Sequence, residues 1–242
     1  MDVYKRIMIH IYSIVRNDAY ILPYFIRHYS TFADKIFIID DHSTDNTKEI
    51  ANSFPNVEVL DYEYNNGFNE DSFSQSLIDH YKKHSRGKAD WVMCADSDEF
   101  IYHKDMKKVL KEQRDKGHRV METLGYMMVS KELPSRGGQI YDEIKEGLIM
   151  PQYGKTVIFD PELNVTFGHG RHKTSIKELV TSGDVGIKLL HYRYLSKEFF
   201  IARSEHLYER AGYDKKTCDY RMKRGLKWYE DALKSKLLKE VI

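Results

Sequence analysis

Three carboxylates stand together near the middle of the chain. Asp96, Asp98 and Glu99 follow the apolar segment 91–95, which reads as a buried strand. Carboxylates at the end of such a strand are costly unless a cation compensates them. Asp96 and Asp98 are two residues apart, so on an extended chain both side chains point the same way and can share one hard divalent cation. The alternative interpretation is a solvated acidic turn followed by a helix N-cap.

A second acidic motif closes an earlier apolar segment. Asp40 and Asp41 end the segment, and Ser43, Thr44 or Asp45 can cap the helix that follows. Acidic residues at strand ends accept hydrogen bonds from a nucleobase N–H or a ribose hydroxyl in nucleotide-binding folds. An ordinary Asx turn and helix cap is the alternative.

The elements around these motifs alternate between strand and helix. Strands are predicted over 6–15, 35–40, 57–62, 91–95 and 118–129, and helices over 18–32, 43–54, 71–84 and 104–116. Asp18 is available as the N-cap of the first helix. This alternation indicates βαβ units and a mostly parallel sheet. Both acidic motifs therefore stand at the carboxyl ends of strands, where ligands bind in open α/β sheets.

The second half of the chain has a different pattern. Residues 135–147 read as a loop, and 156–159 and 163–167 as two short strands that can form a hairpin. A further strand is expected over 187–194, and the pattern is helical from 196 onward. Because no composition shift marks a second unit, we expect one domain. Its parts are a nucleotide-binding half (1–130), an acceptor and metal-completing half (131–195) and a helical tail (196–242).

Composition excludes several classes of protein. The chain has 242 residues, 38 Lys or Arg and 37 Asp or Glu, and this near-balance argues against a dedicated nucleic-acid binder. Its two cysteines form no metal-ligand pattern and fit a reducing compartment. No apolar run approaches the roughly 20 residues of a membrane helix, and the N-terminus is not a convincing signal peptide. We expect a cytoplasmic enzyme or binding domain, with the inner face of the membrane as an alternative location.

Three segments together resemble one enzyme family. IIDDHSTDNT is similar to the VDDGSTDGT segment of family 2-type glycosyltransferases, with His42 and Asn46 in place of two glycines. IHIYSIVRNDAYI is similar to the family's first strand and the Asn-acid pair after it, with Asn17 at the Asn position. ADSDEF resembles the family's DxD motif. The resemblance covers roughly residues 5 to 130, in the family's order, and is nearest to the smaller bacterial branch.

The resemblance implies an α/β fold of the GT-A type, a Rossmann-like and mostly parallel sheet with flanking helices. It also implies a nucleotide-sugar donor, most often UDP-linked, and Mn²⁺ or Mg²⁺ as cofactor. Carried over by position, Asp40 and Asp41 would face the uracil and ribose, Asp96 would lie near the ribose or the metal, and Asp98 would be the main metal ligand. Val15, Arg16 and Asn17 are further nucleotide-binding candidates.

Histidines and cations of the second half can complete such a site. In GT-A enzymes a late histidine often completes the metal site, and His191 matches that role after an apolar strand; imidazole suits Mn²⁺ beside carboxylates. His169 and His172 are weaker alternatives. Lys155, Arg171 and Lys173 are candidates for the charge of the donor diphosphate.

An inverting transfer needs a general base near the anomeric carbon. The candidates after the DxD strand are Glu132, Asp142 and Glu143, and their spacing singles none of them out. A retaining transfer would require no base in that place.

The chain from Arg203 onward carries 11 Lys or Arg and 7 Asp or Glu, interleaved with aromatic residues. This tail is interpreted either as helices packed back on the domain or as a basic surface that contacts anionic lipid. The expected function is transfer of a sugar from a nucleotide-sugar to a hydroxyl of a saccharide or lipid-linked acceptor, in the synthesis of a surface polysaccharide. A non-catalytic nucleotide- or sugar-binding module and a metal-dependent phosphodiesterase are the alternatives. A nucleotidyltransferase is disfavoured because the loop after the first strand, VRNDAY, contains no glycine.

Overall fold

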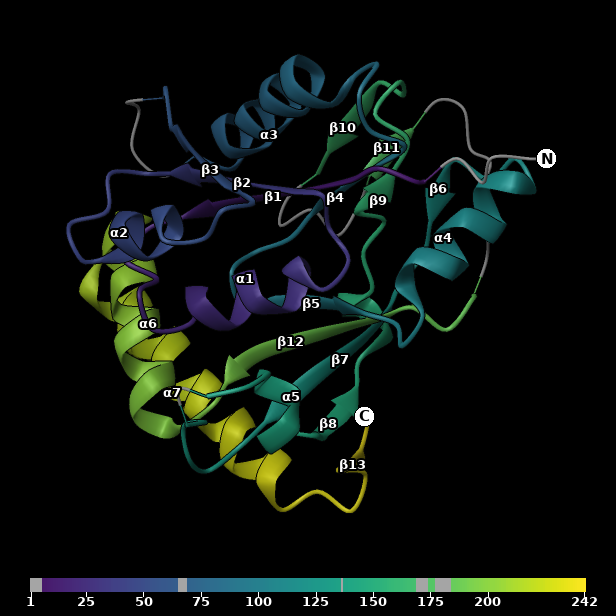
Figure 1. The fold of residues 1–242 in the computed structure, drawn as a ribbon. Coiled ribbons are helices and arrows are strands. Elements are labelled where there is room, and N and C mark those ends of the chain that lie inside the picture. The colour runs from purple at the N-terminus through teal and green to yellow at the C-terminus, as the bar shows by residue number, and fades with distance from the viewer. Residues whose placement is uncertain (1–5, 65–68, 136, 169–173, 177–183) are drawn as a thin grey trace.

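Two β-sheets form the centre of the structure, a computed structural model that describes residues 6–64, 69–135, 137–168, 174–176 and 184–242. The larger sheet has six strands in the order β3-β2-β1-β4-β9-β6, and β3, β2, β1 and β4 run parallel (Figure 1). Its strands are β1 (Ile9–Val15), β2 (Lys35–Asp40), β3 (Val57–Asp61), β4 (Trp91–Cys94), β6 (Val120–Met121) and β9 (Ile158–Phe159). This is the mixed α/β architecture, with a mostly parallel sheet, that was expected.

Alternate residues of the parallel strands pack against different helices, because successive side chains of a strand point to opposite faces. Ile11 and Ile38 belong to the same buried cluster as α1 (Leu22–Ser30), whereas Tyr12 and Phe37 belong to the cluster of α3 (Glu70–Ser85). Figure 1 shows α3 and α1 on opposite sides of this sheet. Both faces are therefore covered, as a parallel sheet requires.

The second sheet has five strands in the order β13-β8-β7-β12-β5. They are β5 (Glu99–Tyr102), β7 (Leu124–Val129), β8 (Glu146–Ile149), β12 (Lys188–Tyr194) and β13 (Lys239–Glu240). A two-stranded sheet joins β10 (Val165–Phe167) to β11 (Thr174–Ile176). The largest buried cluster contains residues of both main sheets, among them Met93 of β4 and Leu190 of β12. This shared core supports the prediction of one domain, which stays a prediction.

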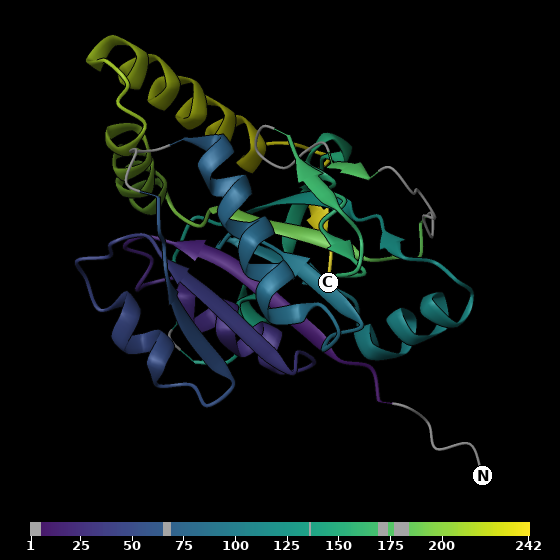
Figure 2. The same ribbon diagram turned by 90° about the horizontal axis from the view of Figure 1, so that it is seen from above.

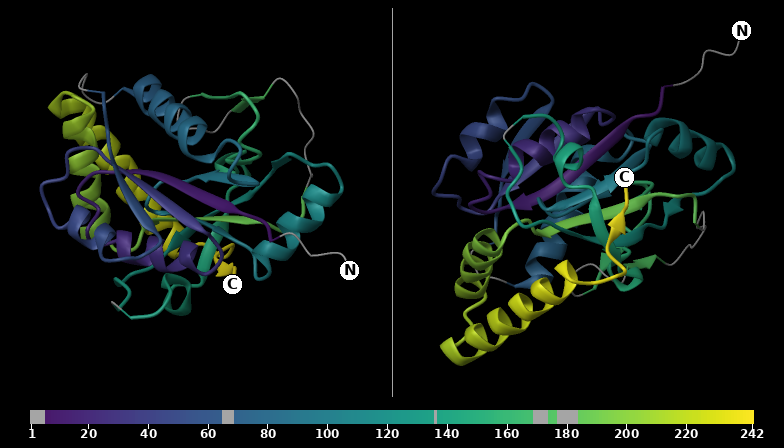
Figure 3. Two further views of the ribbon diagram at one scale, coloured as in Figure 1. Left: turned by 45° about the horizontal axis from the view of Figure 1, so that its top comes forward. Right: turned by 90° about the horizontal axis from the view of Figure 1, so that it is seen from below.

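Two helices near the C-terminus, α6 (Lys197–Arg210) and α7 (Lys215–Leu233), pack on each other and on the end of β12 (Figures 2 and 3). Tyr194 of β12 stacks on Phe200 of α6 with ring centroids 4.8 Å apart, and on Tyr229 of α7 at 5.9 Å. The aromatic residues of the tail therefore hold it on the fold. The remaining helical elements are α2 (Thr47–Asn52), α4 (Met106–Asp115), α5 (Ile140–Glu143) and the 3₁₀ turn η1 (Pro151–Tyr153).

Most expected elements of the first half are present, but several details differ. The strand 118–129 is split into β6 and β7, which belong to different sheets. The loop 135–147 contains α5 and the start of β8. The expected hairpin of 156–159 and 163–167 is wrong: β9 pairs with β4 and β6, and β10 pairs with β11.

Because two histidines are buried, we expect the free energy of unfolding to fall in acid. Burial lowers the pKa of His28 to about 4, although its bond to the Ile101 carbonyl opposes the shift, and burial likewise lowers the pKa of His10 to about 4. Between about pH 6.5 and 4 the unfolded chain therefore binds more protons, so the free energy of unfolding falls as the pH falls. Each histidine contributes up to about 1.4 kcal/mol per pH unit in that window.

Urea unfolding at about pH 7 and about pH 5 measures this effect. In His28→Gln the loss of unfolding free energy between the two pH values should be smaller than in the wild type, since the glutamine amide can still donate to Ile101. The half-exposed His103, substituted as His103→Gln, is the control and should retain the wild-type loss. An unchanged pH dependence in His28→Gln would contradict the assignment.

Candidate functional site

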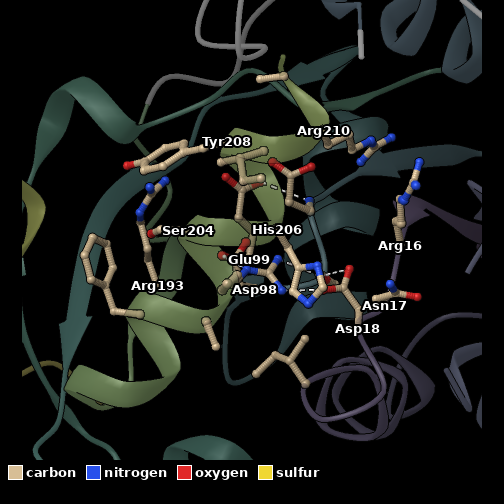
Figure 4. A pocket seen from close by; sticks show the side chains of 18 of the residues that line it. Arg16, Asn17, Asp18, Asp98, Glu99, Arg193, Ser204, His206, Tyr208 and Arg210 are labelled. Atoms are coloured by element: carbon tan, nitrogen blue, oxygen red, sulfur yellow. Dashed lines mark hydrogen bonds and ion pairs between the residues drawn. The ribbon is translucent and has the colours of Figure 1, made fainter. Parts of the chain in front are cut away.

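A cavity of about 570 Å³ opens at the carboxyl ends of β1 and β4, with β12 beside it and α6 as one wall. It is lined by the loop after β1, by the DxD segment, and by charged residues of β12 and α6. Figure 4 shows Arg16 and Arg210 on one side of the cavity, Arg193 and Tyr208 on the opposite side, and Asp98 and Glu99 between them. This is the edge at which the sequence placed both acidic motifs.

Asp98 is the buried acid of the DxD motif, with 5% of the residue exposed. Its Oδ2 lies 3.4 Å from His191 Nε2 and 3.2 Å from Arg203 Nε. The register of β5 and β12 pairs His191 with Glu99, which brings the imidazole beside Asp98. Burial alone raises the pKa of Asp98, but Arg203, His191 and Arg193 outweigh it and hold that pKa well below its usual range. The side chain is therefore an anion at every physiological pH.

Asp18 forms the other half of this network. Its carboxylate binds the Arg203 guanidinium and accepts a hydrogen bond of 2.8 Å from Ser97 Oγ, which in turn accepts one of 3.0 Å from Arg203. Burial lowers the pKa of Arg203, but Asp18 and Asp98 outweigh it and raise that pKa above its usual value. Asp18 is not the N-cap of α1, because Ile21 takes that position and the Asp18 carboxylate faces α6.

Asp96 lies in a different environment from Asp98. The chain turns at Ser97 and Asp98, so it is not extended there as was expected from the sequence, although both Asp96 and Asp98 line the cavity. Asp96 has 42% of its side chain exposed and lies 3.8 Å from Lys155 Nζ. Lys155 is almost fully buried and forms a close ion pair with Glu99, which also accepts a hydrogen bond from the Asp96 backbone N–H.

Lys155 reaches this position because its backbone is bonded to Thr123. Thr123 Oγ1 donates to the Lys155 carbonyl at 2.9 Å and accepts from the Lys155 N–H at 3.0 Å. The neighbouring Gly154 is packed so closely that an added Cβ would clash with the Thr123 carbonyl. Lys155 thus lines the cavity, as expected, but its charge is already matched by Glu99.

Asp41 is shared by two guanidiniums. Arg210 of α6 forms a close ion pair with it, and Arg16 Nη1 lies 3.7 Å from Asp41 Oδ2. Burial lowers the pKa of Arg210 to about 10, and the neighbouring charge of Arg16 acts in the same direction, yet the group stays cationic near neutral pH. Arg16 and Arg210 thus place two guanidiniums at this end of the cavity, where they can bind an anionic group of a ligand.

Asp40 precedes Asp41 and is buried at the end of β2. Its Oδ2 accepts a hydrogen bond of 3.2 Å from the Ser43 N–H and lies 3.5 Å from Lys48 Nζ. Its Oδ1 is buried without a hydrogen-bond partner among the described residues. Neither Asp40 nor Asp41 is part of the cavity lining itself.

The loop after β1 is fastened to the loop after β2. Asn17 Oδ1 accepts a hydrogen bond of 2.8 Å from the Thr44 N–H, and the Asn17 N–H donates to Ser43 Oγ at 3.0 Å. The Val15 carbonyl accepts a bond of 2.8 Å from the Asp41 N–H. Arg16 and Asn17 line the cavity, whereas Val15 is buried beneath it. Asn17 and His42 both have positive φ, 52° and 56°, in the region that favours glycine.

Asp98 and His191 fit a divalent cation. A carboxylate oxygen and an imidazole nitrogen converge in the cavity, and this donor set suits Mn²⁺. His191 Nδ1 is buried without a partner among the described residues, so the bond to Asp98 is the one that orients the ring. Within the described ranges, no group of three or more His, Cys, Asp or Glu side chains is arranged to hold a metal ion. Oxygen atoms of a bound diphosphate would suit such a cation as further ligands.

The structure does not bring the expected general bases to the cavity. Glu132 and Glu143 line a separate hollow between β7 and the end of α7. Asp142 accepts a bond of 2.8 Å from the Gln139 N–H at the start of α5, and Glu143 accepts one from the Ser135 N–H at 2.8 Å. His169, Arg171, His172 and Lys173 lie outside the described residues.

Sequence reasoning missed Arg203, Arg210 and the pairing role of Asp18. The two arginines are seven residues apart, which places them on one face of a helix, and that spacing is the signal that could have found them. The tail packs back on the fold, which was one of its two interpretations, and α6 also forms a wall of the cavity. Among the described residues, no helix combines the length and apolar character needed to cross a membrane.

A comparison with known protein families identifies the family of this chain. The model of the family described as Glycosyl transferase family 2 matches residues 22–162. No curated protein matches the chain significantly. Among solved structures, Staphylococcus aureus TarS residues 1–349 is similar, with 13% identity and a TM-score of 0.47 over 88% of this chain and 68% of that one.

Two further structures are similar at the same low level. TarS 1–349 in complex with UDP-GlcNAc has 11% identity and a TM-score of 0.44, covering 88% of this chain and 70% of that one. Glucosyl-3-phosphoglycerate synthase from Mycobacterium tuberculosis, in complex with Mn²⁺, UDP and phosphoglyceric acid, has 18% identity and a TM-score of 0.38, covering 49% and 43%. The chain spans less than half of that synthase and 42% of the longer TarS structure.

Proposed function

Because the chain belongs to glycosyl transferase family 2, we propose that it transfers a sugar from a nucleotide-sugar, specifically a UDP-sugar, to a hydroxyl of a saccharide or lipid-linked acceptor. The observation that carries this proposal is the convergence of Asp98 and His191 in one charged cavity at the carboxyl edge of the sheet. Ligands bind at this edge in open α/β folds.

The residues divide the cavity into a nucleotide end and a transfer centre. At the nucleotide end, Arg16 and Asn17 line the cavity, and Asn17 bonds their loop to the loop that follows Asp40 and Asp41; we assign the nucleobase and ribose to this end. At the centre, Asp98 and His191 would hold Mn²⁺ or Mg²⁺, which neutralises charge on the departing diphosphate when bound. Arg193, which lines the cavity beside His191, adds a cation for the same charge.

The aromatic part of the cavity lining has the chemistry of an acceptor site. Tyr20, Tyr153, Phe199 and Tyr208 line the cavity, and aromatic faces with hydroxyls suit the rings of sugars. We propose that the acceptor saccharide binds there. The role in a surface polysaccharide, the cytoplasmic location and a contact of the tail with membrane lipid remain predictions.

A thermal-shift panel of UDP, GDP, CDP and ADP, each with and without Mn²⁺, tests the proposal. A ligand that binds the native state alone raises the unfolding temperature by mass action. We expect a shift for UDP that is larger with Mn²⁺ than without it. A panel in which no nucleotide shifts the unfolding temperature would overturn the proposal.

A non-catalytic nucleotide-sugar-binding module is the second candidate. It is favoured by one observation, that Glu132 and Glu143 line a different cavity and Asp142 caps α5. An assay of UDP release distinguishes the transferase from the binding module. The full chain is incubated with UDP-sugars and with mono- or oligosaccharide acceptors. A binding module binds the UDP-sugar but releases no UDP.

A further inference from the structure

A guanidinium stands inside the candidate metal site. Arg203 Nε and His191 Nε2 approach the same atom, Asp98 Oδ2, at 3.2 and 3.4 Å. Oδ2 is the Asp98 oxygen that pairs with His191, so a divalent cation held between the two side chains would bind at this oxygen. Because like charges repel strongly where solvent is largely excluded, the guanidinium and the metal ion compete for one carboxylate.

Arg203 is held in place independently of Asp98. Its guanidinium also binds the Asp18 carboxylate and donates to Ser97 Oγ at 3.0 Å, while Ser97 donates to Asp18 at 2.8 Å. The competing cation is therefore part of the folded structure, and a metal that arrives alone must displace it from a buried partner at considerable cost.

We propose that Arg203 is a built-in counter-ion of the metal site, so that the metal binds together with the nucleotide and only weakly before it. The identity of the nucleotide rests on the proposed function. A diphosphate brings oxygen ligands for the metal and gives the displaced guanidinium a new anionic partner. Arg203 stays anchored to Asp18 and is a positioning residue of the site. By linkage, metal and nucleotide each raise the affinity for the other by the same factor.

Direct binding of Mn²⁺ to the full chain tests the proposal without any turnover. Free Mn²⁺ is counted by electron paramagnetic resonance in titrations without nucleotide and with saturating UDP. For the wild type we expect UDP to raise Mn²⁺ affinity. For Arg203→Gln we expect Mn²⁺ alone to bind roughly tenfold more tightly, within the range that couplings between sites usually span.

The matched control is Arg221→Gln. Arg221 also lines the cavity, but it lies over the Tyr213 ring at 4.4 Å and has no carboxylate partner within 4.0 Å among the described residues. The Arg221→Gln substitution removes the same charge as Arg203→Gln but does not affect a contact with Asp98, so Mn²⁺ affinity should stay at the wild-type value. An equal gain in both variants would show a general field effect and overturn the proposal.

Other outcomes are equally decisive. Unchanged or weaker Mn²⁺ binding in Arg203→Gln overturns the proposal, as does equal Mn²⁺ affinity with and without UDP in the wild type when UDP itself binds. If Arg203→Gln does not fold, Arg203→Lys keeps a cation near Asp18 without the Nε contact, and it should show a smaller gain in the same direction. A wild type that binds no UDP contradicts the proposed function, whereas the titrations without nucleotide still decide the role of Arg203.

Discussion

Replacing Asp98 by asparagine is expected to lower kcat/KM for a UDP-sugar by roughly 100-fold or more and to abolish the Mn²⁺ dependence of UDP binding. Asparagine has the shape of aspartate but lacks the charge that a hard divalent cation requires. Asp98 is also the carboxylate that His191 and Arg203 share. Isothermal titration with UDP, with and without Mn²⁺, measures the loss of coupling directly.

Two controls separate this loss from unfolding. The thermal unfolding of Asp98→Asn is recorded first, because Arg203 loses a partner in this variant. Asp115→Asn removes an exposed carboxylate that pairs with Lys111 on α4, far from the cavity, and should leave donor binding unchanged. If folded Asp98→Asn still bound UDP with the full benefit of Mn²⁺, Asp98 would not be the metal ligand.

The parallel half of the fold could be predicted because its signals are local. β2 has the predicted bounds, 35–40, since an apolar run ends there at two consecutive acids. The pairing of β9 could not be predicted in the same way. A two-residue strand carries almost no pattern, and its partners β4 and β6 are distant in the sequence.

The residues of the site likewise fall into those with a local sequence signal and those that depend on long-range contacts. Acids at strand ends are visible in the sequence, and Asp98 and His191 do meet. The residues that were missed depend on contacts over long sequence separations, such as Arg203 with Asp18, 185 residues apart. Asp18 next to a helix start looks like an N-cap by local rules, but a buried guanidinium is the stronger partner for a carboxylate. His42, at a position where the family segment has glycine, adopts a positive φ in the region that favours glycine.

The buried pair of Lys155 and Glu99 gives the largest expected effect on stability. Both residues are almost fully buried, at 4% and 1% exposure, and their side chains are in close contact. Lys155→Met leaves the Glu99 carboxylate without its cation, which should lower the free energy of unfolding by about 3–5 kcal/mol. Since Glu99 also accepts a bond from the Asp96 backbone, the DxD turn should loosen as well. Urea unfolding measures the loss.

The double variant Glu99→Leu with Lys155→Met distinguishes a structural ion pair from a donor-binding lysine. Removing both charges leaves no buried charge unpaired, and apolar replacements of buried pairs are often neutral in stability. The double variant should therefore be markedly more stable than Lys155→Met alone. If Lys155→Met instead keeps wild-type stability and loses UDP affinity, the ammonium group serves the donor diphosphate and its pairing with Glu99 contributes little to folding. Because Lys155 is deeply buried beside Glu99, we expect these variants to reveal a structural role for its ammonium group and not the binding of the donor diphosphate.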